Sequence, residues 1–221
     1  MKIGIIGLGF VGGAMFESFK NKNVLNLVGY DKYKDGGIGT FKSILDTDIL
    51  FMALPTPYDS NTSEYDKSPI YETCKKLVDN KYSGIVVSKS TVEPGTIDYL
   101  SEEYPLCFVN NPEFLTARTA YEDFHNQKHI VLGACSSCTQ DDLECVKNFY
   151  NRYYPDAEVS LCTALESESM KIFVNCFYAT KVQLFTELYL TCKENGTDYN
   201  KVRSMMLKNG WINEMHTTVP G

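Results

Sequence analysis

Residues 2–12 read Lys-Ile-Gly-Ile-Ile-Gly-Leu-Gly-Phe-Val-Gly, and this stretch decides the fold. The apolar run before the turn predicts a short strand, and the apolar spacing after it predicts a helix over 11–21. Between the two, Gly7, Gly9 and Gly12 fit the pattern G-x-G-x-x-G. Because the pattern follows a predicted strand and opens a predicted helix, it stands where a dinucleotide-binding turn requires it.

In such a turn the first glycine allows the tight bend and the second lets the backbone approach a pyrophosphate, while the helix N-terminus faces the phosphates. Asp31 ends the next predicted strand, where a carboxylate can accept hydrogen bonds from ribose hydroxyls. A 2′-phosphate would be repelled there, which favours NAD, although Lys32 and Lys34 keep NADP open. The residues expected to bind the cofactor at this end are Gly7, Gly9, Phe10, Val11, Gly12 and Asp31.

The chain continues as strands alternating with helices, which implies parallel pairing through crossover connections. We therefore predict an α/β fold with a Rossmann-type, doubly wound, mostly parallel sheet covered on both faces. Residues 58–66 are expected to form a polar loop. The further strands are predicted at 24–30, 48–54, 84–90, 106–110, 129–134 and near 157–162, and the further helices at about 68–80, 95–103 and 139–151.

The character of the sequence changes after residue 163. Residues 164–194 contain no Pro or Gly and predict one long helix, and a second helix follows over about 198–208. We expect residues 1–163 to form an NAD-binding domain and residues 164–221 to form this helix and the start of a central helical domain. Such a helix needs a partner surface, either a further domain or a second subunit, and we expect a homodimer formed through it.

Composition restricts the partners. A net charge of −7 and a pI near 5.0 argue against general affinity for nucleic acid or anionic membranes. No stretch approaches the roughly 20 apolar residues of a membrane span. The eight cysteines are scattered through predicted strands and helices, which favours a reduced, cytoplasmic protein. Cys135 and Cys138 form a C-x-x-C without a second ligand pair, so we expect a loop and no metal.

Four further segments carry a resemblance. They are Leu54-Pro55-Thr56-Pro57, Ser90-Thr91-Val92-Glu93-Pro94-Gly95-Thr96, Asn111-Pro112-Glu113-Phe114-Leu115, and Glu168-Ser169-Met170-Lys171 with Asn175 and Ala179-Thr180-Lys181. In order and spacing the chain resembles the UDP-glucose/GDP-mannose dehydrogenase family. The resemblance implies oxidation of the primary alcohol of a nucleotide sugar to a carboxylate, with two NAD per turnover.

The resemblance also implies roles for single residues. Thr56 and Thr91 would contact the cofactor and the reacting centre, and Glu113 would handle water or a proton. Lys171 and Asn175 would stabilise an alkoxide or hemiacetal oxyanion, since an i,i+4 pair shares one helix face. Thr91, Glu113, Lys171 and Asn175 are thus the expected catalytic residues.

Each of these residues also has a plainer interpretation. The threonines can cap turns, Glu113 can be a surface carboxylate, and Lys171 can form a surface ion pair with Glu168, one turn earlier on nearly the same face.

Two departures from the family pattern matter. Thr116-Ala117-Arg118 stands where a second acidic residue is frequent. Residues 215–221 look like the approach to a loop that would carry a nucleophilic cysteine and an aspartate, and the sequence stops before either. Two explanations stay open: an N-terminal piece of a longer enzyme, or a short relative whose oxidation is partial or lost.

Two other functions compete with a nucleotide-sugar dehydrogenase. A β-hydroxyacid dehydrogenase also joins a Rossmann domain to a long helix that bears Lys and Asn. A non-catalytic NAD-binding module that dimerises through the long helix is the alternative outside enzymes.

Overall fold

A computed structural model describes residues 1–219 of the protein. The chain divides into two compact units, the first spanning Met1–Lys171 and the second beginning at Ile172. The long helix α7 (Ala164–Glu194) starts directly after the 163/164 boundary expected from the sequence. Its first two turns nevertheless belong to the first unit, because Ser167 and Glu168 are buried there.

The first unit is built on one seven-stranded sheet with the order β2-β1-β3-β6-β7-β8-β9. The five strands from β2 to β7 pair in parallel, which confirms the predicted mostly parallel sheet. The strands are β1 (Ile3–Ile6), β2 (Leu27–Tyr30), β3 (Ile49–Met52), β6 (Ile85–Ser88), β7 (Cys107–Asn110), β8 (His129–Ala134) and β9 (Glu158–Thr163).

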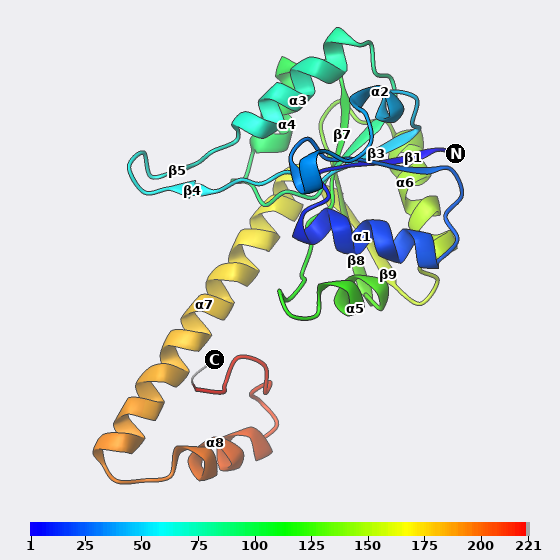
Figure 1. The fold of residues 1–221 in the computed structure, drawn as a ribbon. Helices are drawn as coiled ribbons and strands as arrows, with labels where there is room; N and C mark the ends of the chain where they lie inside the picture. Colours follow the sequence, from blue (N-terminus) through cyan, green and yellow to red (C-terminus); the bar gives the residue numbers. More distant parts are fainter. Residues whose placement is uncertain (220–221) are drawn as a thin grey trace. The chain divides into compact units, whose positions relative to one another are not determined.

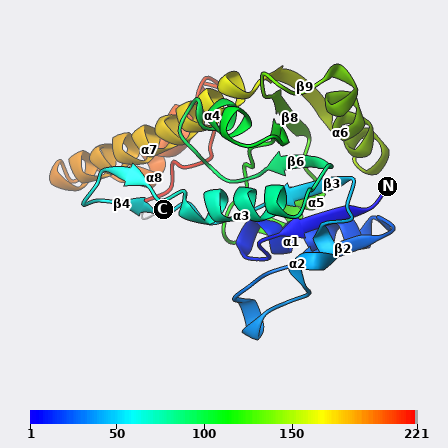
Figure 2. The same ribbon diagram turned by 90° about the horizontal axis from the view of Figure 1, so that it is seen from above.

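Helices cover both faces of this sheet (Figures 1 and 2). One apolar cluster joins the sheet to α1 (Phe10–Asn21), α5 (Ala120–His125) and α6 (Gln140–Tyr153), with Phe19 in edge-to-face contact with Phe51 and Phe149. The second cluster joins the opposite face to α2 (Phe41–Ile44), α3 (Ser68–Asp79) and α4 (Thr96–Glu103). Because successive strand residues point to opposite faces, the fully buried strands β1, β3 and β6 are apolar at every position except Ser88, the last residue of β6.

The glycine turn between β1 and α1 tolerates no side chain at two of its positions. Gly7 has φ +83°, a conformation that L side chains rarely adopt, and a Cβ on Gly12 would lie 1.8 Å from the Gly7 carbonyl oxygen. The backbone of α1 therefore starts in contact with the turn, which fixes the direction of the helix N-terminus.

The pairing of β7 with β8 departs from the expected parallel order. Val109 pairs with Ala134 and Asn110 with Gly133 in antiparallel register, and β9 then follows β8 in parallel. An antiparallel strand starts at the sheet edge where its predecessor ends, so the segment 111–128 need not carry the chain back across the sheet. The sequence gives no local signal for this reversal, because the direction of β8 is set by its pairing with β7. The six-residue helix α5 is too short to show helical periodicity and was also not predicted.

Three other short elements were not predicted. They are the 3₁₀ turn η1 (Lys34–Gly36), the helix α2, and a hairpin of β4 (Tyr58–Asp59) and β5 (Glu64–Tyr65) within the expected loop. In the hairpin, the ring centroids of Tyr58 and Tyr65 lie 5.5 Å apart. Elements of two to four residues are too short for periodicity to show in the sequence.

The second unit contains most of α7 and the helix α8 (Tyr199–Lys208), followed by an irregular segment. Phe185, Cys192 and Tyr199 form its small apolar cluster. The segment 215–221, singled out in the sequence, is described only as far as Val219. Within the described chain, no helix is both long and apolar enough to cross a membrane.

Candidate functional site

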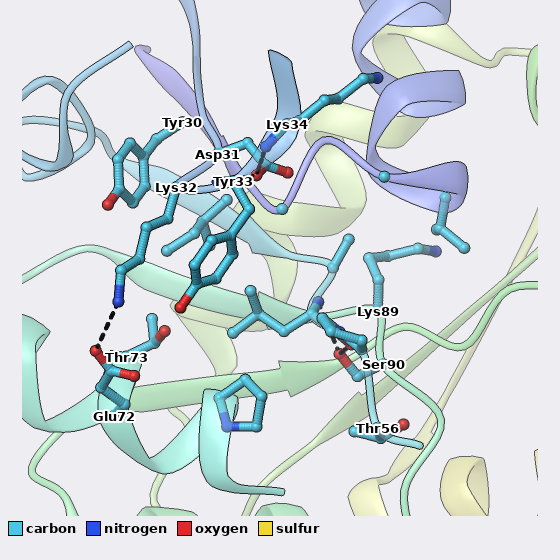
Figure 3. Close-up of a pocket in the computed structure, with 18 of the residues that line it drawn as sticks. Tyr30, Asp31, Lys32, Tyr33, Lys34, Thr56, Glu72, Thr73, Lys89 and Ser90 are labelled. Atoms are coloured by element: carbon cyan, nitrogen blue, oxygen red, sulfur yellow. Dashed lines mark hydrogen bonds and ion pairs between the residues drawn. The ribbon is translucent and has the colours of Figure 1, made fainter. Parts of the chain in front are cut away.

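A cavity of about 1030 Å³ lies in the first unit, beyond the carboxyl ends of β1, β2, β3 and β6 (Figure 3). This is the sheet edge where open α/β folds bind ligands. The predicted residues that line it are Gly7, Gly9, Phe10, Val11, Asp31, Thr56, Thr91 and Glu113. Gly12, Lys171 and Asn175 are not among the lining residues.

The glycine turn is held by the residues that follow β2. The backbone N–H of Leu8 donates to Asp31 Oδ2 at 2.7 Å, and the Lys34 ammonium donates to the Leu8 carbonyl oxygen at 2.7 Å. The N–H and the carbonyl oxygen of Leu8, which belong to two successive peptide groups, are therefore both held without a ligand. A Cβ on Gly9 would meet nothing within 4 Å, so the backbone there faces open space in the cavity.

Asp31 is the most strongly hydrogen-bonded carboxylate of this pocket. Its Oδ1 accepts from the backbone N–H groups of Tyr33 and Lys34, both at 2.9 Å, in addition to the Leu8 bond at Oδ2. Partial burial acts to raise its pKa, but the three backbone donors and the Lys34 charge outweigh burial and hold the pKa below its ordinary value. The group is therefore an ionised acceptor at neutral pH.

The two lysines that kept NADP open are engaged elsewhere. Lys34 is bonded to the glycine turn, and the Lys32 ammonium lies 3.7 Å from the Glu72 carboxylate (Figure 3). Among residues 1–219, neither ammonium group forms an ion pair with Asp31. Both contacts favour NAD over a cofactor with an added phosphate.

At the far end of the cavity, the loops after β3 and β6 are tied together. Thr56 Oγ1 donates to the Thr91 carbonyl oxygen at 2.7 Å, and Ser90 Oγ donates to the Leu54 carbonyl oxygen at 2.7 Å. Leu54 N–H returns a hydrogen bond to Ser90 Oγ at 3.1 Å. Thr56 and Thr91 are thus neighbours. Figure 3 shows Thr56 at the end of the cavity away from Asp31.

Glu113 and Lys171 meet although 58 residues separate them. The Lys171 ammonium lies 3.3 Å from Glu113 Oε1 and also donates to the Glu113 carbonyl oxygen. Glu113 Oε2 accepts from the Leu115 N–H at 2.7 Å, which fixes the carboxylate. The arrangement places a fixed carboxylate and a cation beside the threonine end of the cavity, where they can serve proton transfer and charge stabilisation.

Glu168 does not form the surface ion pair that the sequence left open. It is 1% exposed, and its carboxylate accepts from the backbone N–H groups of Gly95 at 2.6 Å and Ile97 at 2.8 Å. Burial raises the pKa of Glu168, against the two backbone bonds. Gly95 cannot cap α4 with a side chain, so Glu168 caps it from α7.

Asn175 lies on α7 within the second unit and is exposed. Its i,i+4 spacing from Lys171 along the helix is as predicted. Its expected part in an oxyanion site stays a prediction.

Lys89 is the site residue that the sequence analysis missed. It lines the cavity, yet it is 3% exposed, and its ammonium donates to Asn111 Oδ1 at 2.9 Å. The Tyr150 hydroxyl donates to the same oxygen at 2.5 Å, and Asn111 Nδ2 donates to the Val131 carbonyl oxygen at 2.8 Å. This network anchors the turn that leads into Glu113.

A sequence signal for Lys89 did exist. A lysine directly after the apolar strand 84–88 is a cation at the carboxyl edge of a sheet, beside Ser90 and Thr91. Burial lowers its pKa to about 7, and the nearby Lys171 charge acts in the same direction while Glu113 opposes it.

The fold and the cavity together define a dinucleotide-binding domain of the Rossmann class. Residues 38–154 match the model of the UDP-glucose/GDP-mannose dehydrogenase family, NAD binding domain. The chain belongs to this family, and NAD is the cofactor of the matched domain.

Similar proteins agree with this assignment. The chain is 31% identical to the UDP-glucose 6-dehydrogenase AglM of Haloferax volcanii, over 73% of this chain and 41% of that protein. It is 28% identical to the UDP-glucose 6-dehydrogenase TuaD of Bacillus subtilis, over 91% of this chain and 51% of that protein. The chain thus spans about half or less of these relatives.

A solved UDP-glucose dehydrogenase from Pyrobaculum islandicum shares the fold, with a TM-score of 0.81 and 24% identity over 98% of this chain and 58% of that one. A GDP-mannose dehydrogenase from Pseudomonas aeruginosa also has a TM-score of 0.81, at 22% identity, over 96% of this chain and 58% of that one.

Proposed function

We propose that the protein is an NAD-dependent dehydrogenase that oxidises the primary alcohol of a nucleotide sugar to the uronic acid, as a UDP-glucose 6-dehydrogenase does. The observation that carries the proposal is that Thr56, Thr91 and Glu113 all line the dinucleotide cavity, with Thr56 bonded to Thr91 and Lys171 bonded to Glu113. The relatives named UDP-glucose 6-dehydrogenase support the substrate class.

The proposed roles follow the geometry of the cavity. With the pyrophosphate at the glycine turn and a ribose at Asp31, the nicotinamide would extend toward Thr56 and Thr91. The alcohol would lie beside Glu113, which would accept a proton or orient water. Lys171 would then leave the Glu113 carbonyl for the developing oxyanion, and Asn175 would assist it.

Hydride transfer tests the proposal directly. Native protein mixed with NAD⁺ and UDP-glucose should form NADH, together with a sugar product oxidised at the primary alcohol, identified by mass spectrometry. GDP-mannose and 3-hydroxyisobutyrate, each tested in parallel, distinguish the alternatives. NADH formed only with the hydroxyacid would contradict the nucleotide-sugar assignment.

The fold alone leaves the hydroxyacid alternative open. A 3-hydroxyisobutyrate dehydrogenase from Mycobacterium tuberculosis matches 100% of this chain and 75% of its own length with a TM-score of 0.75, at 14% identity. The matched family model favours the nucleotide sugar. NAD binding without NADH formation across the whole substrate panel would instead favour the non-catalytic module.

We also propose a homodimer formed through α7. Phe173, Phe177 and Leu184 are 69%, 62% and 54% exposed, and their spacings of four and seven residues place them on one stripe of the helix. Phe177→Glu should shift the native protein to a monomer in sedimentation, whereas Leu25→Glu, at a 70% exposed position, should not. A Phe177→Glu protein that stays dimeric would contradict this interface.

A cytoplasmic location is part of the same proposal. All eight cysteines are free thiols, as a reducing compartment would keep them.

A further inference from the structure

Three potential metal ligands converge at the end of the sheet opposite the carboxyl edges of the parallel strands. Cys107 begins β7, Cys138 lies in the turn after β8, and Asp142 lies in the first turn of α6. One ligand atom from each lies within 4.8 Å of the other two, and the two sulfur atoms are 3.4 Å apart. All three side chains are half-buried, so an ion could reach them and still lose most of its water.

The sheet topology explains why Cys107 lies close to the other two side chains although it is distant from them in the sequence. Cys135 follows β8 at the end of the antiparallel ladder, where its N–H donates to the Phe108 carbonyl oxygen. The turn closed by Cys138 N–H and the Cys135 carbonyl oxygen then carries Cys138 back over Cys107, 31 residues earlier in the chain.

We propose that Cys107, Cys138 and Asp142 form a binding site for a thiophilic divalent cation of the Zn²⁺ class, with water as the fourth ligand. Binding would release the two thiol protons to solvent, and no electrons would move. The site is separate from the dinucleotide cavity, so the proposal does not depend on the proposed dehydrogenase activity.

Distances favour a metal over a disulfide. At Zn–S bonds of about 2.3 Å, tetrahedral coordination separates two sulfur ligands by about 3.8 Å. The observed 3.4 Å is a few tenths of an ångström from that value, whereas a disulfide requires about 2.05 Å. A disulfide would also leave Asp142 without a function in the cluster.

The carboxylate is already oriented by its neighbours. Asp142 Oδ2 accepts from the Thr139 backbone N–H at 3.0 Å and from Thr139 Oγ1 at 2.5 Å, in the capping box of α6. Outer partners of this kind orient carboxylate ligands in known metal sites. Among the ion pairs of residues 1–219, none involves Asp142, so no side-chain cation competes for it.

Cobalt titration tests the site. The full chain, treated with chelator and reduced with a phosphine, should bind one equivalent of Co²⁺ with a thiolate-to-cobalt charge-transfer band and intense tetrahedral d–d bands, and Zn²⁺ should displace it. Cys107→Ser and Cys138→Ser should each weaken Co²⁺ binding at least tenfold. Cys145→Ser, on α6 outside the cluster, should leave binding unchanged.

Two results would overturn the proposal. One is the absence of a thiolate band in the wild-type chain, or a band equally strong in Cys107→Ser. The other is a Cys107–Cys138 disulfide in unreduced native protein, seen as a loss of two hydrogens by mass spectrometry. Asp142→Asn should weaken Co²⁺ binding while the charge-transfer band persists, and thermal melting checks that each variant is folded.

Discussion

The ammonium nitrogen of Lys89 lies 2.9 Å from Oδ1 of Asn111, at a position where the lysine is only 3% exposed. Asn111 begins the loop that leads into Glu113. The position of the candidate catalytic carboxylate therefore depends on the same asparagine that binds the buried lysine. Because a neutral amide is the direct partner of the ammonium group, burial lowers the lysine pKa to about 7.

This pKa predicts how stability depends on pH. Between pH 7 and the ordinary lysine pKa of 10.5, the unfolded chain holds a proton on Lys89 that the folded chain lacks. The folded protein is therefore most stable, with respect to this group, above pH 10.5, where Lys89 is neutral in both states. Its free energy of unfolding decreases as the pH falls from 10.5 toward 7, because the unfolded chain takes up a proton that the folded chain does not.

The free energy of unfolding of the wild type minus that of Lys89→Met should therefore rise from pH 7 upward, by up to about 1.4 kcal/mol per pH unit. Urea unfolding of both proteins at several pH values measures this difference and cancels the other groups that titrate. Lys75→Met, at an exposed position, serves as the control substitution. A flat difference for Lys89→Met would show that Lys89 keeps its charge when folded.

Replacing Asp31 with Ala should weaken NAD binding by about 1–3 kcal/mol, because a charged acceptor for the ribose hydroxyls is lost. The substitution also removes the bond to Leu8 N–H, which holds the glycine turn. Calorimetric titration with NAD measures the loss, with the exposed Asp79→Ala as the control. Equal NAD affinity in the Asp31→Ala and wild-type proteins would disprove the ribose assignment.

The chain ending at Lys171 should fold into a stable cofactor domain, whereas the chain ending at Thr163 should be less stable. The shorter chain loses the Glu168 cap on α4 and the 2.7 Å bond between Asn110 Nδ2 and Ser167 Oγ. We expect a difference of about 2–4 kcal/mol, from two or three lost buried hydrogen bonds. Denaturant unfolding of the two truncated chains measures it.

Glu168→Gln in the full chain should reproduce part of this loss, because an amide offers only one oxygen to the two backbone donors. Equal stability of the two truncated chains would mean that the first turns of α7 add nothing to the first unit.

Replacing Lys171 with Met should lower kcat by about 10²–10³-fold and leave NAD affinity unchanged, since Lys171 does not line the cofactor cavity. The prediction rests on the proposed dehydrogenase activity. Steady-state kinetics with UDP-glucose and calorimetry with NAD measure the two quantities, and Lys193→Met serves as the exposed control. An unchanged kcat with a raised KM would contradict the catalytic role and show that Lys171 contributes only to substrate binding.

The sequence predicted the sheet, its long elements and the location of the cofactor cavity, because periodicity and the glycine turn are local signals. It did not predict that β8 runs antiparallel or that Lys89 is buried. Both depend on how distant segments pack. The direction of β8 is set by its pairing with β7, and Asn111 and Tyr150 become partners of Lys89 only in the folded chain. The Cys107–Cys138 contact was missed for the same reason, since the two cysteines lie 31 residues apart in the chain.

The backbone of Leu8 bears on the kinetics of cofactor capture, because Asp31 holds its N–H and Lys34 holds its carbonyl oxygen. A phosphate-binding turn that is ordered before the ligand arrives loses little conformational entropy on binding. The association rate constant of NAD should then vary with temperature and viscosity only as much as diffusion does. Selectivity among dinucleotides should lie in their dissociation rate constants.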